Sequence, residues 1–152
     1  MSKNVYNPKS PKSNKSPLSV EEPKVTDIVS WRFSSCDKEM WSLFNGDTLL
    51  PAILPFLQNM EGQTWSYWLT KNKKKCHEVN PDDLTKCAKD RLESLCIEVE
   101  KMLVIHLENT HCLYGYIMNG ICYLMWYDTD HGDNKNCVYR SFKKGNKKKH
   151  NR

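Results

Sequence analysis

Apolar residues alternate with polar ones in the second half of the chain, and this period of two is typical of a β-strand. Near the start, residues 28–33 show the same alternation, because polar positions separate Val29, Trp31 and Phe33. The later strands that the pattern predicts cover residues 102–108, 112–118, 121–127 and 137–142. The folded part of the chain is therefore expected to begin and end in strands.

Between the first and the later strands, apolar positions recur every three or four residues, as in an amphipathic helix. The predicted helices cover residues 48–60, 63–69 and 80–95. Pro51 and Pro55 lie inside the first of them, and each removes a backbone donor, so its start is expected to be irregular. Asn80 followed by Pro81 marks the start of the third. This order predicts an α+β protein with an N-terminal strand, two or three helices and a C-terminal antiparallel sheet.

The dipeptide Asn119-Gly120 lies between two alternating apolar runs, which is a strong signal for a β-hairpin with a two-residue turn. Pairing counted outward from this turn places His111 opposite Asp128. A carboxylate beside an imidazole can prepare the ring as a general acid or base. The same pair is also what a cross-strand ion pair that only closes the hairpin requires, so both interpretations stay open.

The same register gathers four tyrosines on one face of the hairpin, opposite a more aliphatic face that we expect to pack on the helices. They are Tyr114, Tyr116, Tyr123 and Tyr127. Tyrosine rings on an exposed sheet can stack on nucleic-acid bases. The alternative is a half-buried sheet face that uses tyrosine for its β-propensity.

Residues 128–133 (Asp-Thr-Asp-His-Gly-Asp) directly follow the strand predicted at 121–127, and polar clusters at strand ends often carry chemistry. They could bind a divalent metal, carry out acid–base chemistry through His131, or form a turn. The run lacks the length and closing glutamate of a calcium loop, and the chain has no Cys-x-x-Cys pair. We therefore predict neither a metal nor a cofactor, and take His131, Tyr127, Asp128 and His111 as candidate catalytic residues.

The net charge of +5 is unevenly distributed along the chain. Residues 31–134 are acidic, whereas residues 135–152 hold eight basic residues and no acidic one. The composition predicts a disordered Lys/Ser/Pro arm over 1–27, one α+β domain over 28–142 and a disordered basic tail over 143–152. The basic end is a candidate phosphate-binding segment, with Arg140, Lys143 and Lys144 as its candidate contacts.

Seven cysteines are an odd number and too few for a disulfide scaffold, which favours a reduced, intracellular protein. No apolar run approaches the roughly 20 residues of a membrane span, and the N-terminus has no signal-peptide pattern. We therefore expect a cytoplasmic protein without a membrane partner.

Two stretches, 110–116 (Thr-His-Cys-Leu-Tyr-Gly-Tyr) and 124–131 (Leu-Met-Trp-Tyr-Asp-Thr-Asp-His), resemble a set of small bacterial proteins that end in a Trp-Tyr-Asp-x-x-His strand. The order of elements also resembles the RelE/YoeB/ParE toxin superfamily. The resemblance implies an endoribonuclease in which His131 is the acid or base, Tyr127 lies nearby, and Arg140 or Lys143 holds the phosphate. The look-alike proteins tend to carry arginine where this chain has Cys112, which removes one candidate phosphate ligand.

Two functional hypotheses follow. The first is a RelE-like toxin, or more generally a protein that binds or cleaves RNA without a metal, with RNA or the ribosome as partner. The second is a non-enzymatic interaction module whose sheet edge or tyrosine face binds a protein, such as an antitoxin-like segment that adds a strand.

Overall fold

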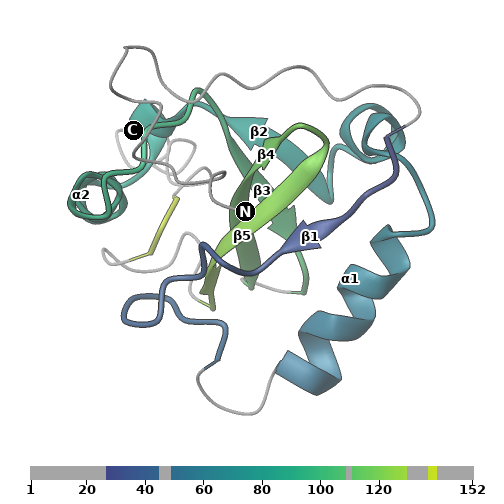
Figure 1. The fold of residues 1–152 in the computed structure, drawn as a ribbon, viewed down its shortest axis with the longest axis horizontal. Helices are drawn as coiled ribbons and strands as arrows, with labels where there is room; N and C mark the ends of the chain where they lie inside the picture. Colours follow the sequence, from purple (N-terminus) through teal and green to yellow (C-terminus); the bar gives the residue numbers. More distant parts are fainter. Residues whose placement is uncertain (1–26, 45–48, 109–110, 130–136, 140–152) are drawn as a thin grey trace, which may run out of the picture.

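A computed structural model describes residues 27–44, 49–108, 111–129 and 137–139 of the chain (Figure 1). They form a five-stranded sheet in the order β1-β5-β4-β3-β2. The strands are β1 (Trp31–Arg32), β2 (Cys76–Val79), β3 (Met102–His106), β4 (Cys112–Met118) and β5 (Ile121–Asp128). β1 runs parallel to β5, and the other neighbours are antiparallel. The α+β class is confirmed, and β3, β4 and β5 pair antiparallel, but the sheet as a whole is mixed because β1 adds to β5 in parallel.

Five helical segments accompany the sheet. They are η2 (Leu49–Ile53, a π-helix), α1 (Leu54–Met60), η3 (Tyr67–Lys71, a π-helix), η4 (Pro81–Asp83, a 3₁₀-helix) and α2 (Lys86–Ser94). Pro55 lies in the first turn of α1, directly after η2, and has no N–H to donate to the preceding turn. The predicted irregular start of the helix over 48–60 is the π-helical turn η2.

The single helix predicted over 80–95 is wrong, because the chain breaks it at Leu84 and Thr85. The side chain of Asn80 caps only η4, and both Leu84 and Thr85 have extended backbones. Thr85 Oγ1 then accepts the N–H of Ala88 at 3.1 Å and caps α2 as a separate helix. Two cap residues close together thus make two short helices.

The strands differ from the prediction in three places. Residues 76–79 pair with residues 102–105 as β2, which the pattern did not predict. The strand expected over 28–33 shrinks to β1, with Ile28 forming an isolated bridge to Thr64. Residues 137–139 are not a strand, and 140–142 lie outside the described residues, as do residues 1–26 and the tail over 143–152.

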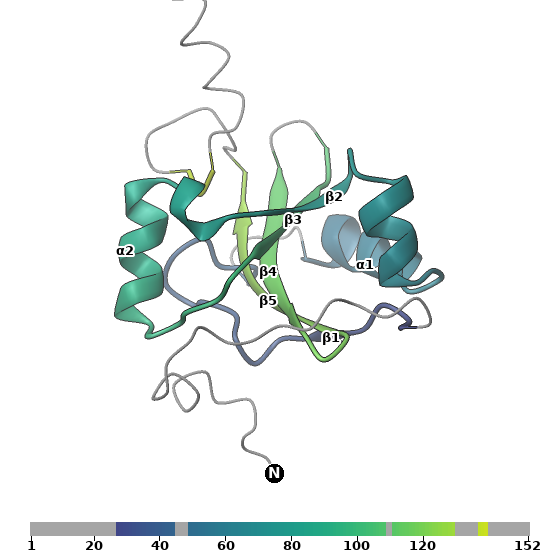
Figure 2. The same cartoon turned by 90° about the horizontal axis from the view of Figure 1, so that it is seen from above.

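The sheet lies between helices on both sides, with α2 against one face and α1 against the other (Figure 2). We call these the α2 face and the α1 face. The α2 face holds the buried side chains of Met102, Val104, Cys112, Tyr114, Tyr116, Tyr123, Met125 and Trp126. The α1 face holds those of Leu103, Ile105, Leu113, Ile117, Cys122, Leu124 and Tyr127.

A β-bulge in β5 interrupts the hairpin. Asn119 and Gly120 form the turn of the hairpin between β4 and β5, with φ values of 53° and 81°, and Met118 pairs with Ile121 across it. The register counted from the sequence holds as far as Gly115, but Tyr114 then pairs with Trp126 instead of Met125. Met125 is the extra residue, so the consecutive side chains of Met125 and Trp126 both reach the α2 face.

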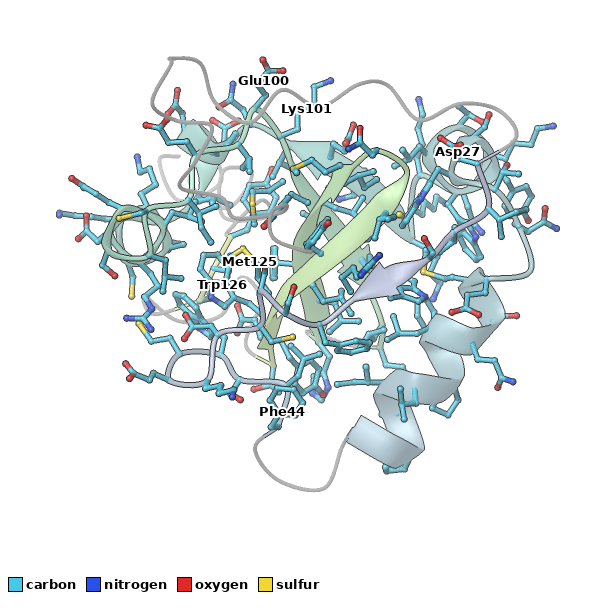
Figure 3. The ribbon with its side chains drawn as sticks, in the orientation of Figure 1. Asp27, Phe44, Glu100, Lys101, Met125 and Trp126 are labelled. Carbon is cyan, nitrogen blue, oxygen red and sulfur yellow. The ribbon has the colours of Figure 1, made fainter. Side chains whose placement is uncertain are left out.

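Two features fit this bulge into the fold. A Cβ on Gly115 would collide with the carbonyl oxygen of Tyr123, so only glycine allows the strands to approach this closely. The carbonyl of Met125, in turn, accepts the backbone N–H of Asp37 at 3.0 Å. Figure 3 shows Met125 and Trp126 beside the segment that carries Phe44. The segment that leads from β1 therefore covers β5 at the bulge.

Candidate functional site

The bulge changes the partner of His111. Beyond it, Leu113 pairs with Tyr127 and Cys112 with Asp128. Since side chains alternate between faces, Tyr127 lies on the α1 face and is the diagonal neighbour of His111, whereas Asp128 lies on the side of Cys112. The prediction that His111 faces Asp128 is therefore wrong, because the extra residue moves each position of β5 by one.

His111 and Tyr127 form a hydrogen-bonded pair instead. The Tyr127 hydroxyl lies 2.9 Å from Nδ1 of His111, and the rings meet edge to face with centroids 5.7 Å apart. Tyr127 is buried and His111 is half-buried. An imidazole can give and take protons near neutral pH, and a hydrogen bond to one ring nitrogen sets what the other can do. This pair is an acid–base group at the end of the hairpin.

Asp128 has a structural role. Its side chain is 2% exposed, and Oδ2 accepts the backbone N–H of Val138 at 2.8 Å. Thr85 adds two bonds to the same segment, since its N–H donates to Val138 O and its hydroxyl donates to Cys137 O. Residues 137–139 are thus anchored between the end of β5 and the start of α2.

The predicted tyrosine face is not exposed to solvent. Tyr114, Tyr116 and Tyr123 are 0%, 1% and 7% exposed, and the rings of Tyr116 and Tyr123 stack on each other with centroids 5.3 Å apart. Burial raises the pKa of the Tyr114 hydroxyl far above its usual range. The expectation of a half-exposed face is wrong because α2 and the segment after it cover the rings, which therefore offer no platform for bases.

Four of the predicted site residues lie outside the described residues, namely His131, Arg140, Lys143 and Lys144. The site that can be built consists of His111 and Tyr127. Tyr127 lies on β5, near its end, and His111 directly precedes β4.

The strongest polar cluster was not predicted from the sequence. Arg91 on α2 donates two hydrogen bonds of 2.8 Å to the carboxylate of Asp37, and Trp126 Nε1 donates a third of 3.0 Å. The backbone N–H groups of Glu39 and Met40 also donate to Asp37 Oδ1. Asp37 is 4% exposed, so this cluster joins the segment after β1, the helix α2 and the bulge in the core of the α2 face.

Burial of Asp37 opposes its ionisation, but the hydrogen bonds from Arg91, Glu39, Trp126 and Met40 outweigh that effect. They hold the pKa of the carboxyl group well below its usual range, and the same contact raises the pKa of Arg91. Asp37 is therefore a fixed carboxylate at neutral pH. It lacks the titration range of a general base, and we assign it to stability.

The buried thiols are not activated. Burial raises the pKa of Cys36 to about 11 and that of Cys76 and Cys112 to about 12. All seven cysteines are free thiols. A nucleophilic thiolate needs a lowered pKa, so thiol catalysis by these three residues has no support.

The described residues contain neither a metal-binding cluster nor a membrane-spanning helix. Over residues 27–44, 49–108, 111–129 and 137–139, no three or more His, Cys, Asp or Glu side chains are arranged to hold a metal ion. Within the same ranges, no helix has the length and apolar character that a bilayer crossing requires.

Comparisons of the chain with protein-family models, with curated proteins and with solved structures found no match. The His111–Tyr127 pair and the charge pattern of the sequence are therefore the features of the molecule that bear on its function.

Proposed function

We propose that the protein binds RNA and cleaves it without a metal ion, in the manner of a RelE-like endoribonuclease. The observation that carries this proposal is the 2.9 Å contact between the Tyr127 hydroxyl and Nδ1 of His111. In this acid–base pair, Tyr127 lies on β5 and His111 directly precedes β4, and the chain continues from β5 into the stretch that contains His131. Acid–base groups and phosphate contacts are what this chemistry requires.

His111 acts as the general base in this proposal. When its Nδ1 carries the ring proton and donates it to the Tyr127 oxygen, the lone pair on Nε2 is free. Nε2 takes the proton of a ribose 2′-hydroxyl, whose oxygen attacks the adjacent phosphorus. The bond to the 5′-oxygen then breaks, and His131 protonates that oxygen. The products are a 2′,3′-cyclic phosphate and a 5′-hydroxyl end, and Tyr127 is the positioning residue.

The basic end of the chain supplies the phosphate contacts. The region over 31–134 is acidic, so it does not offer a broad surface for a polyanion. Arg140 stabilises the charge that develops on the attacked phosphate, while Lys143 and Lys144 bind neighbouring phosphates. RNA binding is therefore expected to weaken steeply as the salt concentration rises.

The test is cleavage of a short oligoribonucleotide by the full-length protein in EDTA, with detection of the cyclic phosphate end. His111→Gln and His131→Ala should each lower the rate about 100-fold or more, the usual contribution of a general acid or base. Tyr127→Phe should lower it less and change its pH profile, because the ring of His111 loses its partner. Tyr67→Phe is the matched control, since it removes a hydroxyl from η3. A dependence on Mg²⁺, or full activity of both histidine variants, would contradict the proposal.

A second candidate is a non-enzymatic interaction module, which is favoured by the position of β2. Among the described strands β2 is at the end of the sheet and pairs only with β3, so a partner strand can add to its other side. An antitoxin-like peptide that binds one to one, and that no longer binds a Glu78→Pro variant, supports this function. Binding that survives Glu78→Pro contradicts it.

A further inference from the structure

Two histidines meet across the last two strands of the sheet. His77 on β2 and His106 on β3 are diagonal neighbours, because His77 pairs with Val104 two positions away. Their Nε2 atoms are 3.0 Å apart, and the ring planes differ by 21°. Ring centroids 5.1 Å apart show that the rings meet almost edge to edge through these nitrogens. Neither residue has a role in the proposed cleavage.

A contact of this length between two imidazole nitrogens needs one hydrogen atom between them. A neutral pair provides it, since one Nε2–H donates to the lone pair of the other ring. A pair with one extra proton still provides it. With two extra protons, both nitrogens become donors, and two positive charges face each other, so the contact is lost.

Several groups lie around the two rings. On the other side of His106, Nδ1 lies 3.4 Å from Sγ of Cys112, whose thiol stays neutral because burial raises its pKa to about 12. Behind that thiol, Asp128 is the paired residue on β5 and accepts the N–H of Val138. Burial lowers the pKa of His77, against a smaller opposite effect of a backbone hydrogen bond at Glu78.

The pair bridges β3 and β2, one of the two edge strands of the sheet. β2 is four residues long and lies at the end of the sheet, where backbone bonds open most easily. Beside it, the N–H of His106 donates to Lys75 O at 2.8 Å, so the same histidine fixes the start of β2 through its backbone. Loss of the side-chain contact therefore acts on the attachment of β2 to β3.

We propose that His77 and His106 form a pH-sensitive clamp that holds β2 on β3 at neutral pH and releases it in mild acid. The closed pair accepts at most one extra proton, whereas the open form accepts two. Opening therefore takes up one proton below the pH at which free histidine ionises, about 6.5. By linkage, the equilibrium constant for opening rises up to about tenfold for each pH unit below that point.

Hydrogen exchange of the full-length protein tests the clamp. The opening constants of the β2 amides, corrected for the intrinsic effect of pH on exchange, should be constant between pH 8 and 7, rise about fourfold between pH 6.5 and 5.5, and approach a tenfold rise per pH unit at lower pH. Amides in the centre of β4 and β5 serve as the internal reference, and their opening constants should change less than about twofold.

His77→Gln places an amide near the position of Nε2 and removes one titrating group, so the pH-dependent opening of β2 should disappear. His106→Gln, on β3, should also abolish the pH-dependent opening of β2. The control variant His150→Gln should leave that pH dependence unchanged. An opening constant of β2 that does not vary with pH in the wild-type chain overturns the clamp. So does a pH dependence that persists in both glutamine variants. The pH profile of the wild-type chain alone can overturn the clamp, so the test does not depend on whether the variants fold.

Discussion

The two faces of the sheet are buried to a similar degree but stabilised by different means. On the α1 face, three tryptophan N–H groups donate to backbone carbonyls, namely those of Trp31 to Leu57, Trp65 to Gly120 and Trp68 to Met60. The α2 face instead buries the Asp37 carboxylate with Arg91 and Trp126. Among the described residues, the ion pair with a buried carboxylate lies on the α2 face, so we expect acid to change the stability of that face more than that of the α1 face.

The largest effect is expected where the ion pair is broken. Asp37→Ala leaves the guanidinium of Arg91 and the indole N–H of Trp126 without their acceptor, which should lower the free energy of unfolding by about 3–5 kcal/mol. Urea unfolding at pH 7 measures it. Glu39→Gln removes an exposed carboxylate from the same arginine and should change stability by less than about 0.5 kcal/mol. Similar values for the two variants would contradict the central role of Asp37.

The second largest loss of stability is expected at the β-bulge. Gly115→Ala forces a Cβ against the carbonyl of Tyr123, which can be relieved only by moving a backbone strand, so we expect a loss of about 3 kcal/mol. Gly62→Ala is the control, because the nearest atom to its new Cβ is at an ordinary contact distance of 3.5 Å. Thermal unfolding compares the two variants. A Gly115→Ala protein as stable as wild type would show that the strands separate easily at the bulge.

On the α1 face, Trp65→Phe removes the 2.7 Å hydrogen bond to Gly120 O and leaves a small cavity. The expected loss is about 2 kcal/mol at pH 7. Because no buried charge is involved, the loss should be the same at pH 5 and pH 8. A loss that varies with pH would contradict the contrast between the faces.

The smallest expected effect is the change in the free energy of unfolding per pH unit in acid. The pKa of Asp37 is lowered in the folded protein, so its contribution to stability is complete above the pKa of the unfolded chain, near 4. It is lost as the pH falls toward the lower folded value, at up to about 1.4 kcal/mol per pH unit. Urea unfolding between pH 5 and pH 2 should show this slope in the wild type. In Asp37→Ala the slope should be shallower by this contribution, and equal slopes would contradict it.

Local patterns predicted the local parts of the fold. Alternation located β3, β4 and β5, and Asn119-Gly120 located the turn between the last two. The bulge escaped prediction because alternation counts positions and carries no sign of an inserted residue. That single residue replaced the predicted His111–Asp128 pair with the His111–Tyr127 pair.

Long-range pairs lay beyond sequence reasoning. Asp37 and Arg91 are 54 residues apart, and the pattern placed Arg91 only within the helix predicted over 80–95. Nothing local distinguishes a buried arginine from an exposed one. β2 was missed because four residues give too short a pattern of alternation.

The parallel pairing of β1 with β5 has a consequence for the order of folding. Trp31 and Arg32 pair with Cys122 and Tyr123, from which most of the chain separates them. Closing so long a loop is slow because its entropy cost comes before its contacts form. During synthesis the first strand emerges early, yet its partner emerges late. This topology predicts that the N-terminal edge of the sheet is completed last, after the β4–β5 hairpin already exists as a template.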